Sequence, residues 1–359
     1  MNNQDSVNEL PLVSLVITSF NRAGLISSAI KSALLQDYPN LEIIISDNCS
    51  TDNTNMIINE YIKDARVKYS INQRNIGMLP NFLKATKELA KGKYITYVSS
   101  DDYLVNKSFI SEAVGRMAQC PTVLLVHSIN ASVIIATNER FLDESYEYYK
   151  DSFYRKEYVN GMEVFNKFPF CHSISFGGTL FDREKLIACD PFLGKVLSGD
   201  TQIVLKLLQL GDAAFLDKET YVVQRHGGNA TSTVSKAQTY IDNLAYIEVP
   251  YQFAIKRNEI DKAFLMRWRE DMYCNSCSQC MLNLYKIDKT EYKLFSSFLM
   301  QEHPVVFRRI TKQFRWQLNK AIFARRDIGS MYLRSAKLYR QFKSVIRGHK
   351  GSALKHPVE

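Results

Sequence analysis

Hydrophobic and polar positions between residues 12 and 217 alternate between short β-branched runs and amphipathic stretches. This alternation predicts successive βαβ units around a mostly parallel sheet. Residues 13–18 predict the first strand, and the apolar residues of 23–36 recur at helical spacing. Residues 41–46 form an apolar run that is typical of a strand buried on both faces.

The same pattern predicts further elements along the chain. We expect helices at 53–61, 81–90, 107–117 and 201–210, strands at 67–71, 94–98, 122–127 and 179–181, and another strand pair at 213–216 and 221–224. From about residue 235 the strand pattern ends and long helical patterns take over. We therefore predict an α/β domain at 1–235 and a helical region at 236–359.

Composition narrows the class of protein. The 359 residues are 46% hydrophobic and 23% charged, as in an ordinary globular protein without disorder. The N-terminus lacks a secretory signal, and no apolar stretch approaches the ~18 residues of a membrane-spanning helix. We expect a cytoplasmic protein.

The seven cysteines are an odd number and do not form a secreted disulfide pattern, which predicts reduced thiols. Cys274, Cys277 and Cys280 have a spacing that suits a metal site or one side of a helix. The helical pattern around them and the lack of a second CxxC pair favour the helix.

The net charge of +9 is concentrated near the C-terminus. Thirteen Lys or Arg residues stand against one acid between Arg308 and Lys350, and aromatic and aliphatic residues alternate with them from His303 onward. One interpretation is contact of 303–350 with an anionic membrane surface, and the other is a helical subdomain with a solvated basic face. We do not expect nucleic-acid binding, because no such motif is present; homo-oligomer formation stays open.

Polar residues cluster at the ends of three predicted strands, at 18–21, 47–52 and 101–102. In an open parallel sheet, ligands bind beyond the carboxyl ends of the strands. Adjacent carboxylates such as Asp101 and Asp102 repel each other unless a cation or proton compensates them. Mg²⁺ and Mn²⁺ favour one or two carboxylates together with phosphate oxygens. The alternative is that Asp102 caps the helix predicted at 107–117.

Residues 11–22, 36–52, 75–77, 92–95 and 101–102 occur in an order and spacing that resembles the family 2 inverting glycosyltransferases. The resemblance is strong over residues 10–130 and weaker to about 235. It implies a GT-A fold, a Rossmann-like α/β architecture with a mostly parallel sheet flanked by helices, here with a helical C-terminal extension.

The resemblance also implies a donor site. Thr18 and Phe20 match positions that hold the nucleotide base. Asp47 matches the carboxylate that accepts a hydrogen bond from a uracil or thymine N–H, and Arg74 matches a position that reaches the diphosphate. The expected nucleotide-binding residues are Thr18, Phe20, Asn21, Arg22, Asp47, Asn48, Arg74, Asn75, Gly77, Ser100 and Asp101.

Asp101 and Asp102 match the family's DxD-type motif, with Asp102 as the expected direct ligand of Mn²⁺ or Mg²⁺. The chain has Ser100-Asp101-Asp102 and not a strict D-x-D, so the division of roles between the two aspartates stays open. His226 either completes the shell of the metal as a neutral imidazole or balances the leaving diphosphate as a cation. A histidine on a surface loop is the alternative.

An inverting transfer needs a general base for the acceptor hydroxyl. Asp200, which precedes an apolar helical run, matches the family's base, although Asp is also a common helix cap. Gly177, Gly178 and Gly199 are expected near the donor sugar or acceptor, where glycine permits a close approach, or in simple turns. We interpret His127 and His172 as structural.

These features predict an enzyme that transfers a sugar from a UDP-sugar or dTDP-sugar to a hydroxyl of a surface glycan or lipid-linked glycan. A dinucleotide-dependent oxidoreductase is disfavoured, because no G-x-G-x-x-G follows the first strand. A sugar-nucleotide-binding scaffold without turnover is the remaining alternative.

Overall fold

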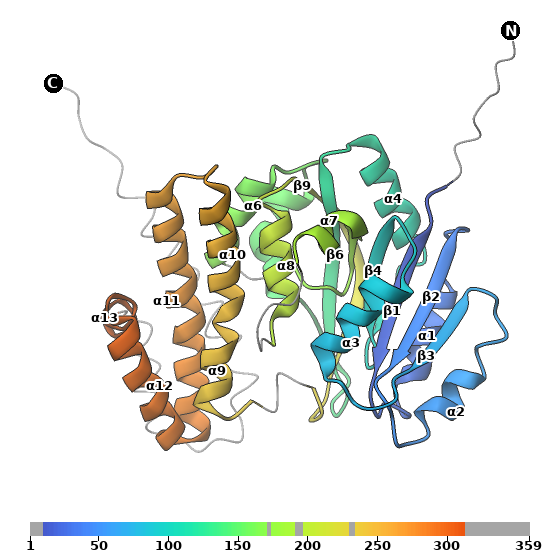
Figure 1. Ribbon diagram of the computed structural model, residues 1–359, viewed down its shortest axis with the longest axis horizontal. Coiled ribbons are helices and arrows are strands. Elements are labelled where there is room, and N and C mark those ends of the chain that lie inside the picture. The colour runs from blue at the N-terminus through green and yellow to red at the C-terminus, as the bar shows by residue number, and fades with distance from the viewer. Residues whose placement is uncertain (1–9, 171–173, 191–196, 230–233, 313–359) are drawn as a thin grey trace, which may run out of the picture. The chain divides into compact units, whose positions relative to one another are not determined.

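The computed structural model describes residues 10–170, 174–190, 197–229 and 234–312 (Figure 1). Its first strands and helices follow the order expected from the sequence: β1 Val13–Ser19, α1 Ile26–Leu34, β2 Leu41–Asp47, α2 Thr54–Asn59, β3 Val67–Ile71, α3 Met78–Lys84 with the π-helical η1 Ala85–Leu89, and β4 Tyr94–Ser99. The next elements are β5 Tyr103–Leu104 and α4 Phe109–Gln119. The later elements are β6 Val123–Ile134, β7 Glu139–Leu142, α5 Glu144–Tyr149, η2 Lys150–Tyr154, α6 Gly161–Lys167, η3 Phe168–Phe170, β8 Thr179–Asp182, α7 Arg183–Ala188, α8 Gly199–Leu207, β9 Asp212–Arg225 and the helices α9 Ala237–Asn243, α10 Ala245–Arg257, α11 Lys262–Ile287, α12 Lys289–Glu302 and α13 Pro304–Lys312.

The strands within the described residues form one sheet in the order β3-β2-β1-β4-β8-β6-β9-β5, with β7 paired to β6. β3, β2, β1 and β4 are mutually parallel, and so are β6 and β9. β8 runs antiparallel to β4 and to β6. The loop that precedes β8 therefore reaches the same edge of the sheet as the carboxyl end of β4.

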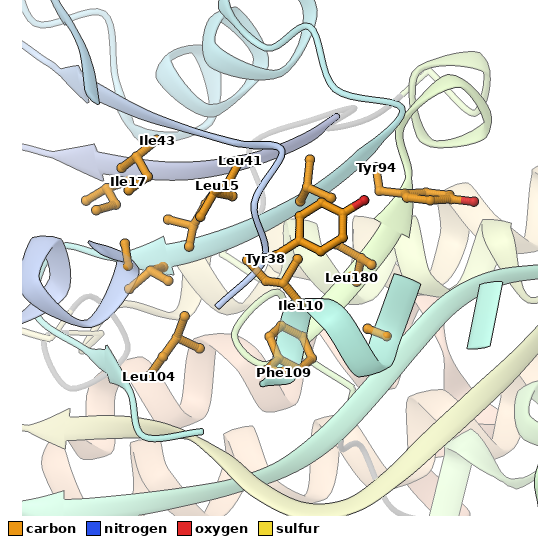
Figure 2. Close-up of a cluster of buried hydrophobic side chains, with 14 of the residues drawn as sticks. Leu15, Ile17, Tyr38, Leu41, Ile43, Tyr94, Leu104, Phe109, Ile110 and Leu180 are labelled. Carbon is orange, nitrogen blue, oxygen red and sulfur yellow. The ribbon is translucent and has the colours of Figure 1, made fainter. Parts of the chain in front are cut away.

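Helices cover both faces of this sheet. On one face, apolar side chains of α1 and α4 pack against alternate residues of β1, β2 and β4, as Figure 2 shows for Leu15, Ile17, Ile43, Phe109 and Ile110. These five side chains are almost completely inaccessible to solvent. Burial of this apolar surface supplies most of the stability of the fold.

The opposite face of β4 carries an aromatic cluster. Tyr97 stacks on Phe176 with ring centroids 4.5 Å apart, and Phe82 of α3 meets Tyr97 edge to face. The Tyr97 hydroxyl also makes a 2.7 Å hydrogen bond with Thr86 in η1. This cluster connects α3 to the segment before β8, and both border the site described below.

Three of the expected elements differ from the structure. The helix expected at 81–90 begins earlier, at Met78, because Pro80 lies in its first turn, where a missing N–H costs no helical hydrogen bond. The strand pair expected at 213–216 and 221–224 is wrong, since β9 is continuous and its pairing with β6 contains register shifts near Ile129. The short strands β5 and β7 were not expected.

The chain divides into two compact units, Met1–Ser276 and Cys277–Glu359, with the boundary inside α11. Within the described residues, β9 is the last strand, and the expected domain boundary near residue 235 stays a prediction. Cys274, Cys277 and Cys280 are buried residues of α11. Among the helices that the structure describes, none combines the length and apolar character needed to cross a bilayer.

The first residue of α6, Gly161, lies against the chain between α8 and β9. A Cβ at this position would overlap the carbonyl oxygens of Gly211 and Leu208, which are backbone atoms that cannot rotate away. We expect Gly161→Ala to destabilise the protein by about 1–3 kcal/mol, measured by urea unfolding. Gly115→Ala in α4 is the matched control, because its Cβ would meet nothing within 4 Å. The packing argument is wrong if both variants unfold at the same urea concentration.

Candidate active site

A cavity of about 610 Å³ lies at the carboxyl ends of β1 and β4. Twelve of the residues expected in the site line it: Thr18, Phe20, Arg22, Asn48, Asn75, Gly77, Ser100, Asp101, Asp102, Gly177, Gly199 and Asp200. Asn21, Asp47, Arg74, Gly178 and His226 do not line it. The fold thus brings together residues from Thr18 to Asn229 in the sequence, as the convergence of strand ends requires.

The loop after β1 is held by the loop after β2. The Asn21 backbone has a φ of 51°, and its N–H donates to Ser50 Oγ at 2.9 Å. The Asn21 side chain accepts from the Thr51 N–H at 2.8 Å. Asn21 therefore shapes this loop, whereas its neighbour Phe20 is 40% exposed at the cavity.

Asp47 lies at the end of β2 and is buried. Its Oδ1 accepts from the Ser50 hydroxyl at 2.5 Å, and its Oδ2 accepts from the Tyr69 hydroxyl at 3.3 Å. Arg74 is exposed on the loop after β3. The roles expected for these two residues, in base and diphosphate recognition, remain predictions.

Asparagine side chains form a network at the side of the cavity that Asn48, Asn75 and Asn81 line. Asn48 donates to Asn75 at 2.8 Å and accepts from Asn72 at 3.1 Å. Asn81 in α3 accepts from Asn72 and from Ser46 Oγ, and it donates to the Ser46 carbonyl. Asn72 and Asn81 were not predicted, although a polar residue on the buried side of a helix, as at Asn81, indicates such a partner.

Asp101 and Asp102 follow β4 directly, and they differ in their surroundings. Asp102 is buried: its Oδ1 accepts from the Gln224 N–H and its Oδ2 from the Tyr221 hydroxyl, both at 2.8 Å. Burial and the neighbouring Asp101 carboxylate raise the pKa of Asp102 to about 7. The helix-cap alternative for Asp102 is wrong, because α4 begins at Phe109 with Ser108 as its capping residue.

The Asp101 carboxylate is partly accessible and lies beside the side chains of Arg22 and His226. Its Oδ2 lies 3.1 Å from His226 Nε2 and 3.6 Å from Arg22 Nε. The Nδ1 atom of His226 accepts from the Gly228 N–H at 3.1 Å, so the neutral ring carries its proton on Nε2 and donates it to Asp101. His226 is therefore a neighbour of the acidic pair, just outside the lining of the cavity.

Asp200 is half-buried and stands in the first turn of α8. Ser198 occupies the capping position of this helix, so Asp200 is not its cap residue. The Asp200 carboxylate accepts from the Thr201 N–H at 2.8 Å and from the backbone N–H of Phe176. Burial raises the pKa of Asp200 above its ordinary value.

Several residues that line the cavity were missed by sequence reasoning, among them Ser19, Phe176, Tyr221, Arg225 and Asn229. Ser19 belongs to the predicted polar cluster at 18–21 but was not among the expected nucleotide-binding residues. Tyr221 and Phe176 are aromatic residues in or next to strands, which usually indicates a core position. Nothing in the local pattern distinguishes them from the buried aromatic residues of the sheet.

The packing around Gly177 and the backbone conformation of Gly178 each require glycine, independently of any ligand. A Cβ on Gly177 would overlap the Tyr221 ring, and Gly178 has a φ of 68°. His127 is buried and makes a 2.7 Å hydrogen bond with Thr179, consistent with a structural role. His172 lies outside the described residues.

Residues 14–188 match the family model described as Glycosyl transferase family 2, which places this segment of the chain in that family. The chain is 38% identical over 99 residues to GalNAc(5)-diNAcBac-PP-undecaprenol beta-1,3-glucosyltransferase of Campylobacter jejuni, covering 27% of this chain and 32% of that protein. It is 44% identical over 96 residues to UDP-Glc:alpha-D-GlcNAc-diphosphoundecaprenol beta-1,3-glucosyltransferase WfaP of Escherichia coli, covering 27% of this chain and 38% of that protein. The chain thus matches about a third of the length of these curated relatives.

Solved structures confirm the predicted GT-A α/β fold. TarS 1-349 of S. aureus in complex with UDP-GlcNAc has a TM-score of 0.62 at 20% identity, covering 80% of this chain and 79% of that one. The mannosyltransferase PcManGT of Pyrobaculum calidifontis in complex with GDP-Man and Mn²⁺ has a TM-score of 0.53 at 17% identity, covering 88% and 87%. At these identities the likeness concerns the fold alone.

We expect Asn81→Ala to destabilise the protein by about 1–3 kcal/mol, because it removes the acceptor of the buried Ser46 hydroxyl and one of the two acceptors of the Asn72 amide. Urea unfolding measures this loss. Asn166→Ala, at an exposed position within α6, is the control, because Asn166 does not line the cavity. Equal unfolding of Asn81→Ala and the wild type would contradict a structural role for the network.

Proposed function

We propose that the protein is an inverting glycosyltransferase that transfers a sugar from a nucleoside diphosphate sugar to a hydroxyl of a glycan. One observation carries the proposal: a single cavity holds the acidic pair that follows β4 and, from a segment about a hundred residues later, the carboxylate of Asp200. Two separated acidic groups are what such a transfer needs, one on the side of the leaving diphosphate and one beside the acceptor hydroxyl.

A UDP-sugar is the proposed donor, with a dTDP-sugar as the alternative. The names of the E. coli relative and of the TarS complex both contain UDP-sugars, which supports this choice. The exposed ring of Phe20 at the cavity can stack on a base, and Arg22, Asn48 and Asn75 supply polar groups nearby. Asp47 and Arg74 keep their proposed roles in base and diphosphate recognition.

A divalent cation fits the acidic side of the cavity. The described residues contain no set of three or more His, Cys, Asp or Glu side chains placed to hold a metal. One or two protein ligands leave positions for phosphate oxygens and water, as Mg²⁺ and Mn²⁺ prefer. A bound Mn²⁺ or Mg²⁺ would neutralise the charge that develops on the leaving diphosphate.

Asp101 is the proposed direct ligand, in place of Asp102 as expected from the sequence. Asp102 is buried and each of its oxygens accepts a hydrogen bond from the protein, whereas the side chain of Asp101 is 14% exposed. His226 donates to Asp101 and is proposed to stabilise the negative charge there as a hydrogen-bond donor and, when protonated, as a cation.

Asp200 is proposed to take the proton from the acceptor hydroxyl. Burial raises the pKa of Asp200, and a carboxylate with a raised pKa is a stronger base toward a hydroxyl proton. Attack from the side opposite the diphosphate then gives inversion. Both curated relatives act, by their names, on undecaprenol-linked sugars, which supports a lipid-linked acceptor and work at a membrane surface.

The predicted contact of 303–350 with a membrane stays a prediction, since 313–350 lie outside the described residues. Within α13, Val306 and Ile310 are buried, and Arg308, Arg309 and Lys312 are exposed. This arrangement suits both interpretations of the basic segment.

UDP with Mn²⁺ is expected to raise the melting temperature more than dTDP, GDP or CMP, because a ligand at about 100 times its Kd stabilises a protein by about 2.7 kcal/mol. Asp101→Ala is expected to abolish the Mn²⁺-dependent part of the shift. Asp217→Ala, an exposed residue of β9, is the matched control and should behave as the wild type. A larger shift with GDP would instead indicate a GDP-sugar donor.

Asp200→Asn is expected to lower the rate of transfer by about 10²–10⁴-fold, because the amide cannot accept the proton. The measurement is UDP release from UDP-glucose with an α-GlcNAc-diphosphoryl polyprenol as the acceptor, compared with Asp217→Asn. The melting shift with UDP and Mn²⁺ should remain. A scaffold without turnover would bind UDP, and neither the wild type nor the variant would release it from the sugar.

A further inference from the structure

Tyr221 occupies a central position between the two acidic sides of the cavity. It lies in β9, paired with Leu104 of β5 on one side and with Asn130 of β6 on the other. The residue is 3% exposed, yet it lines the cavity. Its hydroxyl and its ring contact different segments of the site.

The hydroxyl holds the turn that carries the acidic pair. It accepts from the Ser99 N–H at 3.1 Å and donates to Asp102 Oδ2 at 2.8 Å. The Asp102 N–H donates back to the Ser99 carbonyl at 3.0 Å, which closes the turn. Because Tyr221 binds both ends of this turn, it determines where Asp101, between them, presents its carboxylate.

The ring supports the segment before β8. Gly177 lies directly against the ring, with no space for a Cβ. Asn130, the neighbour of Tyr221 across the strands, donates to the Gly177 carbonyl and to Ser175 Oγ, both at 3.1 Å. Ser128 donates to the Gly178 carbonyl at 2.9 Å. Residues 175–178 are therefore held against β6 and β9.

Residues 175–178 also contact Asp200, the proposed general base. Phe176, next to Gly177, donates its backbone N–H to the Asp200 carboxylate. A continuous series of contacts thus runs from Asp102 through Tyr221 and Gly177 to Phe176 and Asp200. Tyr221 is the residue in this series that contacts both the turn from Ser99 to Asp102 and the segment 175–178 beside Asp200.

We infer that Tyr221 is a positioning residue that sets the spacing between the diphosphate side and the acceptor side of the site. The inference rests on the proposed glycosyltransferase function. An in-line displacement needs the attacking oxygen, the sugar carbon and the leaving oxygen to be aligned, and a misplacement of about 1 Å can cost about 10²-fold in rate. The Tyr221 hydroxyl positions the acidic pair on the diphosphate side, and the Tyr221 ring positions residues 175–178 on the acceptor side.

Two substitutions separate these roles. Tyr221→Phe retains the ring against Gly177 and removes both hydroxyl bonds. We expect it to weaken the Mn²⁺-dependent binding of UDP, measured by calorimetry, by about tenfold or more, as for other groups that orient a metal ligand. The KM for the acceptor, an α-GlcNAc-diphosphoryl polyprenol, should change by less than about twofold.

Gly177→Ala should have the opposite effect, because its Cβ displaces the segment from the ring. We expect the KM for the same acceptor to rise, and transfer to fall by about 10²-fold, with Mn²⁺-dependent binding of UDP unchanged. Asn130→Ala removes the donor to Gly177 without adding an atom, so it tests the same side if Gly177→Ala does not fold. Melting temperatures of all three variants are measured alongside.

The inference is overturned if Tyr221→Phe binds UDP and Mn²⁺ as the wild type does, or if all variants lose donor binding, acceptor binding and melting temperature together. It is also overturned if Gly177→Ala and Asn130→Ala both leave the acceptor KM unchanged. A wild type that neither binds UDP with Mn²⁺ nor releases it from UDP-glucose contradicts the proposed function itself, and the inference with it. Measurement of the wild type first distinguishes these failures.

Discussion

The buried hydrogen bond from the Tyr221 hydroxyl to Asp102 is the interaction on which the arrangement of the site depends. Two carboxylates in sequence repel each other, and burial strengthens that repulsion. The fold keeps Asp102 in place with the Tyr221 hydroxyl and the Gln224 N–H, both from β9. Asp101 can then project toward the cavity beside Arg22 and His226.

The direction of β8 brings the second half of the site to the first. Had β8 run parallel to β4, its leading loop would lie at the opposite edge of the sheet. Because β8 is antiparallel, residues 175–178 lie beside the end of β4, and Phe176 meets Asp200 there. One strand direction thereby places the acidic pair after β4 and the Asp200 carboxylate around a single cavity.

Buried polar networks give this edge of the sheet a defined shape. Asn48, Asn72 and Asn81 connect β2, β3 and α3 through hydrogen bonds whose loss would leave buried polar atoms unsatisfied. An apolar contact of the same area would allow several relative positions of β2, β3 and α3, because it has no directional bonds. The loops that bear Phe20 and Asn75 are therefore attached to a framework with one arrangement of hydrogen bonds.

The amino-acid sequence by itself indicated the order of elements from β1 to β4, the polar clusters at the strand ends and the candidate residues Asp101, Asp102 and Asp200. The order of elements and the polar clusters follow from local periodicity, which records whether each residue is buried. The choice of Asp200, and of Asp101 and Asp102 as a metal motif, follows from the resemblance to the family 2 glycosyltransferases. The continuity of β9, the register of β6 and the contacts of Tyr221 with Asp102 and Gly177 were decided only by the tertiary structure. Tyr221 is 119 residues from Asp102, and its pattern is that of any buried strand residue, so only the pairing of distant strands could place it between the two sides of the site.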